Sequence, residues 1–262
     1  MVFDLLALPW RGAVASLCAG GATAIGAAAV FCVPKNQHKL KDALMSFAAG
    51  VMLAASFFGL IIPGLSAAKG LGFGERAGFA LVAMGIVLGA GFVLLLNHCI
   101  PHEHFEIGHH GPISAVHLKK IWLFVIAIAI HNLPEGMAVG VSFAGDNWNN
   151  GLAISLGIGL QNIPEGFAVA IALLSVGYRR LYSFAVASLT GLLEFAGGTV
   201  GVLTLGFSHS FYPTILGFAG GAMLFIISDE IIPESHSQGH ETLATLFLML
   251  GLVVMMAFDV LL

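Results

Sequence analysis

Eight long apolar stretches are the feature that most constrains how this chain can fold. Each holds about 20 or more mostly apolar residues, the length that a helix needs to cross the hydrocarbon core of a bilayer. Inside a bilayer the chain itself must satisfy every backbone N–H and C=O, and a helix does so within one segment. We therefore predict an all-α integral membrane protein, a single domain over residues 1–262, with eight transmembrane helices at 12–33, 43–65, 77–98, 120–143, 150–176, 183–206, 212–233 and 242–262.

The composition agrees with this prediction. Hydrophobic residues make up 58% of the chain and charged residues only 9%, whereas soluble domains carry about 25% charged residues. The formal net charge is -4 and no basic stripe is present, so we expect the lipid bilayer and small ions as partners, and no nucleic acid. Gly85 with Gly89, and Gly197 with Gly201, have the small-xxx-small spacing that predicts close packing between helices.

The positive charges predict how the helices are oriented. Lys and Arg are enriched in cytoplasmic loops, and with eight spans seven of them fall on one side and three on the other. We therefore predict both termini outside and a His-rich cytoplasmic loop at 97–118. The seven are Lys35, Lys39, Lys41, Lys119, Lys120, Arg179 and Arg180, and the three are Arg11, Lys69 and Arg76.

Polar residues interrupt the middle of three spans. Two near copies, HNLPEG and QNIPEG, begin thirty residues apart in spans four and five. His131 and Glu135 are i and i+4 and so share a helix face, as do Gln161 and Glu165. Glu194 lies near the middle of span six. Ionisable groups at this depth are costly and usually functional.

A short turn joins spans four and five, so they run antiparallel and bring their two motif carboxylates face to face. Facing carboxylates in low dielectric repel each other unless they are protonated or bridged by a cation. Imidazole with carboxylate oxygen suits zinc and other first-row metals. Pro134 and Pro164 remove the helix hydrogen bonds to the carbonyls of Ile130 and Leu160, which predicts a kink beside each motif. The alternative is that the prolines kink the helices and the polar groups only bond to each other, but a duplicated motif plus a third glutamate is costly for that purpose alone.

At these residues the sequence resembles the ZIP family of divalent metal transporters, and looks closest to its bacterial GufA-like members. The resemblance covers essentially the whole chain. It implies an inverted 3+2+3 repeat, a homodimer in a bacterial inner membrane, and alternating access by sliding of spans one, four, five and six against the others. It also implies a binuclear metal site, with one position formed by His131, Glu135, Gln161 and Glu165 near Met52, and a second by Asn132, Asn162 and Glu194, bridged by Glu135 and Glu165.

Two positions depart from the family pattern. Some relatives carry Asp where this chain has Asn162, and Pro where it has Phe195. The loss of one carboxylate predicts that the second metal position is the weaker of the two.

Further polar residues are candidates for the path to and from the site. Asp229 and Glu230 lie at the predicted cytoplasmic end of span seven, where they would take the metal on release with help from His236 and His240. Asp259, near the outer end of span eight, would attract cations at the entrance. For these residues a plain solvated helix end is an equal alternative. The His-rich loop predicts weak, flexible metal binding by His98, His102, His104, His109 and His110.

The function that these features favour is transport of divalent cations into the cytoplasm, chiefly Zn²⁺ and also iron, manganese or cadmium. A metal-selective ion channel is an open alternative, because the sequence does not separate a channel from a carrier. An intramembrane metal-dependent hydrolase is a second alternative. It would need His-Glu-x-x-His on one helix, and each motif here has one His or none.

Overall fold

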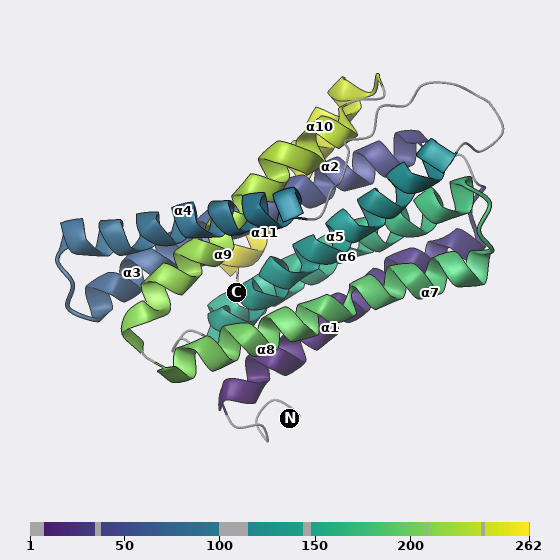
Figure 1. Cartoon of the computed structure of the whole chain (residues 1–262). Coiled ribbons are helices and arrows are strands. Elements are labelled where there is room, and N and C mark those ends of the chain that lie inside the picture. Colours follow the sequence, from purple (N-terminus) through teal and green to yellow (C-terminus); the bar gives the residue numbers. More distant parts are fainter. Residues whose placement is uncertain are drawn as a thin grey trace.

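The computed structural model describes residues 8–34, 38–99, 115–143, 148–207, 209–236 and 239–261, and within them it contains helices and turns and no strand (Figure 1). The elements run in the order α1 Leu8–Ala28, η2 Ala29–Phe31, α2 His38–Ala54, η3 Ala55–Ile61, α3 Ile62–Gly70, α4 Glu75–Cys99, α5 Ala115–Ser142, α6 Trp148–Ser175, α7 Arg180–Thr190, α8 Leu192–Phe207, η4 His209–Phe211, α9 Tyr212–Ile226, η5 Ile227–Ile231, α10 Ile232–Ser235 and α11 Glu241–Leu261.

Eight helical stretches in the described residues are long and apolar enough to cross a membrane, which confirms the predicted fold class. They are Trp10–Phe31, Lys39–Gly70, Glu75–Leu96, Ile121–Ser142, Trp148–Ser175, Arg180–Leu203, Tyr212–Ser235 and Glu241–Leu261. The second is the most extended relative to the expected 43–65, because its helix continues through η3 into α3. The predicted loop at 97–118 is also shorter than expected. α4 continues to Cys99 and α5 begins at Ala115, since hydropathy marks where a helix leaves the apolar region and not where it ends.

The helices form two groups (Figure 1). In the motif-bearing group, α1 packs against α5, α6, α7 and α8, and α5 packs against α6 and α8. In the flanking group, α4 packs against α9, α11 against α2, and α3 against both α4 and α9. The two groups meet chiefly where α2 contacts α6 and where α5 contacts α9. Spans one, four, five and six thus pack against one another, and they meet the other four spans chiefly through α2 and α9.

Glycines set the closest approaches between helices, as the small-xxx-small spacing predicts. A Cβ on Gly85 would lie 2.2 Å from the Thr214 carbonyl oxygen, and one on Gly89 would lie 2.0 Å from that of Phe218, so α4 and α9 touch backbone to backbone. A Cβ on Gly197 would lie 2.1 Å from the Leu133 carbonyl oxygen, which brings α8 against α5 beside the first motif.

Spans two and seven share an interruption that hydropathy did not reveal. Each contains a π-helical segment, η3 in one and η5 in the other, followed at once by a short α-helix with proline in its first turn. The same three residues, Ile-Ile-Pro, mark both junctions, at 61–63 and 231–233. π-Helical turns inside α-helices are rare and are frequently found at functional sites. The match between spans two and seven is also what an inverted repeat requires.

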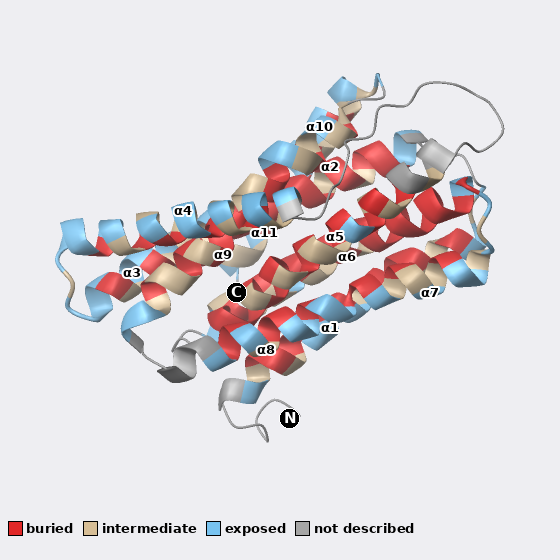
Figure 2. Cartoon of the chain, in the orientation of Figure 1, coloured by how far each residue is buried: buried red, intermediate tan, exposed pale blue. Residues whose placement is uncertain are grey.

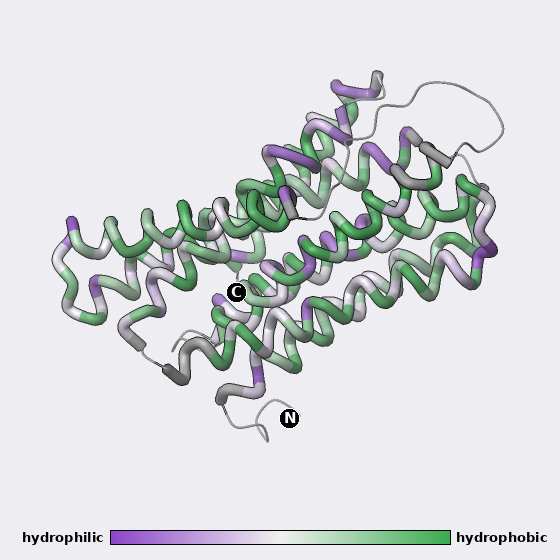
Figure 3. The backbone as a smooth tube through the Cα atoms, viewed as in Figure 1, coloured by the Kyte–Doolittle hydropathy of each residue, from purple (hydrophilic) through white to green (hydrophobic). Residues whose placement is uncertain are grey.

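Large apolar side chains cover the outside of the bundle as well as its core. Val87 on α4 and Val260 on α11 are 70% and 78% exposed, and Figures 2 and 3 show that much of the exposed surface of the helices is hydrophobic. Aromatic residues lie toward the helix ends: Trp122 donates to the Tyr178 hydroxyl at 2.9 Å, and Phe143 packs edge-on against Trp148. Lipid-facing apolar residues with aromatic groups near both ends are typical of a membrane-spanning bundle.

Candidate metal-binding site at the centre of the bundle

Seven polar side chains of the two motifs and span six are buried in the middle of the motif-bearing group. His131 and Glu165 are 2% exposed and the other five are fully buried. They come from α5, α6 and α8, and we call them the mid-span group: His131, Asn132, Glu135, Gln161, Asn162, Glu165 and Glu194. The structure therefore buries every polar motif residue that the sequence analysis assigned to the metal positions.

The mid-span group contains most of the unpartnered buried polar atoms in the described residues. Of eighteen buried side-chain nitrogen and oxygen atoms there that have no hydrogen-bond partner, twelve belong to these seven residues. They include both ring nitrogens of His131 and both carboxylate oxygens of Glu135 and of Glu165. Buried polar groups are normally hydrogen-bonded, and an unpartnered one costs about 1–3 kcal/mol. Apart from the hydrogen bonds of Asn162 and the contact of His131 with Glu230, the group is therefore a set of nitrogen and oxygen donors without protein partners, which is the chemistry that a cation needs.

Asn162 is the member whose hydrogen bonds are defined. Its Nδ2 donates to the Ala19 carbonyl of α1 at 2.8 Å and to Oε1 of Glu194 at 2.6 Å. Its Oδ1 makes no hydrogen bond. The amide thus ties α6 to α1 and α8, interacts with one oxygen of Glu194, and leaves its own oxygen to act as a neutral ligand.

The glycine that closes each motif explains how these carboxylates reach one another. A Cβ on Gly136 would lie 2.0 Å from the backbone carbonyl oxygen of Glu194, and one on Gly166 would lie 2.0 Å from that of Thr23. Only a residue without a side chain lets α5 meet α8, and α6 meet α1, at this level. Gly136 therefore places Glu194 against the turn that carries Glu135.

The three glutamates lie within electrostatic range of one another. Glu135 interacts with Glu165 and Glu194, and the Gln161 amide lies beside Glu135. Across the described residues, no three His, Cys, Asp or Glu side chains already stand at metal-binding distances. The donor set mixes amides with carboxylates, and its carboxylates repel each other unless a cation or protons lie between them.

Glu230 also belongs to this site, which sequence reasoning did not foresee. Its Oε2 lies 3.1 Å from Nε2 of His131, and its side chain is only 12% exposed. The sequence analysis placed Glu230 with Asp229 at the end of span seven, but span seven continues past it through α10 to Ser235. The π-helical turn of η5 carries Glu230 to the mid-span group, whereas Asp229 is exposed. The repeated Ile-Ile-Pro next to η5 was the signal that would have suggested it.

The remaining candidates lie on other elements, and whether Met52 lies near the first position stays a prediction. Met52 is fully buried in the apolar core on α2, and Asp259 is partly exposed near the end of α11. His98 is exposed in the last turn of α4. His236 and His240 lie on either side of the gap that precedes α11, and both bond to other protein groups. His102, His104, His109 and His110 lie outside the described residues.

The helices that carry the motifs are continuous, whereas span six is divided. Both α5 and α6 continue as single helices through Pro134 and Pro164, and the kink expected beside each proline stays a prediction. Span six is divided into α7 and α8 at Gly191, and Glu194 lies in the first turn of α8. Gly191 lies at the crossing with α1, where its Cβ position would be 2.3 Å from the Gly20 carbonyl oxygen.

Comparison with known proteins identifies the family. The model of the ZIP Zinc transporter family matches residues 102–259, which include both motifs and Glu194. This chain belongs to the ZIP family. It is 46% identical over 242 residues to the zinc transporter ZIPB of Bordetella bronchiseptica, an alignment that covers 91% of this chain and 77% of that protein.

Other relatives are similar over nearly their whole length. The zinc transporter GufA of Myxococcus xanthus is 42% identical over 248 residues, covering 95% of this chain and 97% of the relative. The human zinc transporter ZIP11 is 32% identical over 321 residues, covering 92% of this chain and 94% of the relative. ZIP proteins are multi-pass membrane transporters and not enzymes, so the hydrolase alternative is dropped.

Proposed function

We propose that this protein carries Zn²⁺ across the membrane and that the ion binds in the mid-span group. The observation that carries the proposal is the concentration there of twelve unpartnered buried nitrogen and oxygen atoms on imidazole, amide and carboxylate groups. Three buried glutamates are expensive in an apolar bundle unless a cation neutralises them. Imidazole and carboxylate are zinc ligands, and the same donors accept iron, manganese and cadmium.

Two metal positions follow from the donors. His131, Glu135, Gln161 and Glu165 would form the first, and Asn132, Asn162 and Glu194 the second, with Glu135 and Glu165 bridging. The second is the weaker, because Asn162 contributes a neutral oxygen and its amide already donates to Glu194. Glu230, which contacts His131, would receive the ion as it leaves the first position.

The distribution of positive charge supports transport into the cytoplasm. The starts of α2, α5 and α7 lie at one end of the bundle, opposite the turn between α3 and α4 (Figure 1), and they carry the larger share of Lys and Arg. That end would face the cytoplasm, with both termini outside, in a bacterial inner membrane. Arg180 at this end also bonds to the Val30 carbonyl, and to that of Val33 at 3.1 Å, so it holds α7 to the end of span one.

The division into two groups of helices supports a carrier in preference to a channel. Met137 and Leu133 of α5 meet glycines of α8 backbone to backbone, and Thr23 of α1 meets Gly166 in the same way, so the motif-bearing group packs as one unit around the ion. Such a unit would move against the flanking group, which would also form the homodimer interface, and this motion would give alternating access.

Zinc uptake by the purified protein in proteoliposomes tests the proposal. We expect uptake that saturates with zinc concentration and is slow compared with open-pore conduction. Competition by Fe²⁺, Mn²⁺ and Cd²⁺ would rank the metals. Uptake that stays linear to high zinc concentration and scales with voltage would favour the channel. An absence of uptake by folded protein would contradict the proposal.

A further inference from the structure

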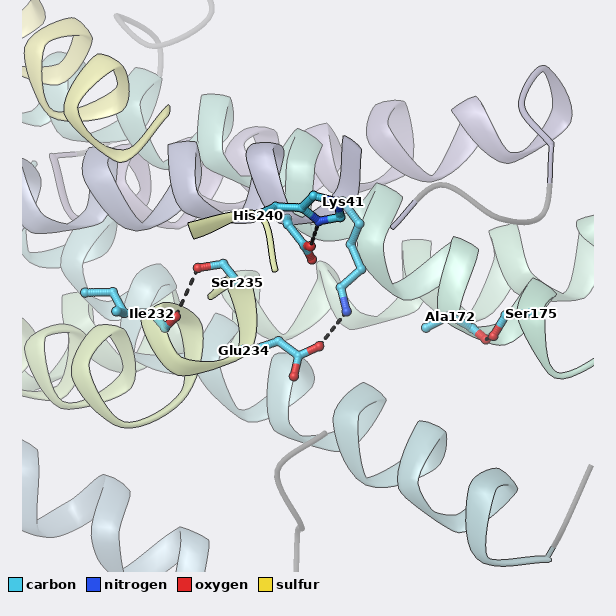
Figure 4. Close-up of polar contacts among 8 residues, drawn as sticks. Lys41, Ala172, Ser175, Ile232, Glu234, Ser235 and His240 are labelled. Atoms are coloured by element: carbon cyan, nitrogen blue, oxygen red, sulfur yellow. Dashed lines mark hydrogen bonds and ion pairs between the residues drawn. The ribbon is translucent and has the colours of Figure 1, made fainter. Parts of the chain in front are cut away.

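A buried lysine lies at the end of the bundle that we assign to the cytoplasm. Lys41, in the first turn of α2, is only 7% exposed. Its Nζ lies 2.5 Å from Oε1 of Glu234 on α10, a residue 193 positions further along the chain (Figure 4). The side chains of the pair are 8% and 11% exposed, so this is not a solvated surface ion pair.

A second pair, next to the first, consists of a carboxylate and an imidazole, which are common zinc ligands in proteins. Asp42 follows Lys41, is 1% exposed, and places its Oδ2 2.9 Å from Nδ1 of His240 (Figure 4). Its other oxygen, Oδ1, is buried and makes no hydrogen bond. Carboxylate oxygen and imidazole nitrogen are zinc ligands. We call Lys41, Asp42, Glu234 and His240 the end group.

Span seven connects the mid-span group to the end group. Glu230 contacts His131, and Glu234 follows Glu230 about one helical turn further along span seven. Lys41 also lies over the ring of Phe124 on α5, 5.2 Å from its centroid, so it touches the helix that carries the first motif. An ion that passes from His131 to Glu230 next meets the acids and imidazole of the end group.

We propose that Lys41 is a tethered cation that keeps the end group from retaining the departing metal ion. The ammonium neutralises Glu234, so that this carboxylate does not join Asp42 and His240 as a third zinc ligand, which lowers the affinity of this end for zinc and favours release. This inference rests on the proposed function. A buried ammonium repels a transported cation, so it would not be expected in a site that only attracts one. A role in release accounts for its presence here.

Replacement of the charge tests the proposal. Lys41→Met keeps an apolar stem without the ammonium, and we expect it to bind one more zinc ion per chain than the wild type in equilibrium dialysis. Uptake should slow by about tenfold, because an added ion held at the exit delays each cycle. Lys41→Arg should behave like the wild type, and Lys69→Met, at an exposed lysine, is the matched control.

The double variant Lys41→Met/Glu234→Gln separates this role from a structural one. The tethered-cation account expects it to lose the extra zinc and regain uptake, since the carboxylate that gained the metal is gone. A purely structural ion pair would give no extra zinc in the single variant and no recovery in the double variant. Extra zinc that persists in the double variant would also contradict the proposal.

Two controls address misfolding of the Lys41 variants and a possible absence of transport. Lys41→Gln serves as a second neutral variant, and if both neutral variants fail to fold while Lys41→Arg folds, the lysine is a structural tie and the proposal is wrong. Zinc stoichiometry is measured on detergent-purified protein without any flux. The comparison with the wild type therefore stands even if the proposed transport is not observed.

Discussion

The mid-span group and the end group contain the same kinds of side chain in opposite states. The mid-span group is buried and the end group largely so, with only His240 as much as 30% exposed, and both combine glutamate or aspartate with histidine. In the mid-span group, Glu135 and Glu165 have no hydrogen-bond partner on either oxygen, whereas in the end group Lys41 pairs with Glu234 and His240 with Asp42. The difference is Lys41. The mid-span group contains no lysine or arginine, whereas the end group contains this one ammonium group.

This contrast teaches that acidic and imidazole content alone does not identify where a transporter holds its ion. A group without an internal cation is set up to bind one from outside, because its charges and polar atoms are otherwise uncompensated. A group with an internal ammonium is set up to let the ion pass. The predictions below test this distinction, beginning with the largest expected effect.

Removal of a mid-span carboxylate should abolish transport. We expect Glu135→Ala and Glu165→Ala each to lower zinc uptake by about a hundredfold or more, in line with the loss of a principal charged ligand. Uptake into proteoliposomes at matched protein content measures the effect. Glu75→Gln, at an exposed glutamate of α4, is the control and should leave uptake unchanged. Near wild-type uptake by either alanine variant would show that the ion binds elsewhere.

The motif glycine should be nearly as sensitive as the ligands. Gly136→Ala places a Cβ 2.0 Å from the Glu194 carbonyl oxygen, so α5 and α8 must separate. Overpacking of this kind costs about 1–3 kcal/mol. We expect a lower melting temperature in detergent and at least about tenfold slower uptake, because a ligand displaced by 1 Å loses much of its effect.

Gly21→Ala is the matched control for that substitution, since its Cβ would meet nothing within 4 Å. A stable, fully active Gly136→Ala protein would show that α8 need not touch α5 for the site to work.

The second metal position should respond to charge at residue 162. Asn162→Asp adds a carboxylate beside Glu194 and removes the amide donor that now bonds to it. We expect higher occupancy of the second position by zinc, and slower release. Glu194→Gln should empty that position and leave the first occupied. Zinc stoichiometry, measured on both purified variants, tests these expectations. Equal occupancy of both positions in the wild type at limiting zinc would contradict the prediction that the second position is the weaker.

The smallest effect is expected from the His-rich loop. Deletion of residues 100–111 should leave basal uptake within about twofold of the wild type, because a His-rich tract can concentrate metal ions without lying on the obligatory path. Metal bound per chain should fall at saturating zinc. Complete loss of uptake by a folded deletion variant would place the loop on the path itself.

The sequence predicted eight spans and pointed to the polar motif residues that are buried within them, because polar residues in apolar runs are costly and therefore conspicuous. It placed Glu230 on the exit path but not against His131, since hydropathy does not show the π-helical turn that carries this residue. The sequence analysis used Lys41 only to predict which side faces the cytoplasm. Its partner Glu234 is 193 positions away, and only the fold brings the two side chains together. The division of span six at Gly191 was missed as well, since its cause is contact with Gly20 of another helix.

The most direct test of the account is the position of zinc in crystals of the wild-type protein, located by anomalous diffraction at the zinc edge. The contrast between the two groups predicts the strongest peak among His131, Glu135 and Glu165, a weaker peak beside Glu194, and none among Lys41, Asp42, Glu234 and His240. A strongest peak in the end group, or none among the mid-span carboxylates in protein that carries zinc, would contradict it.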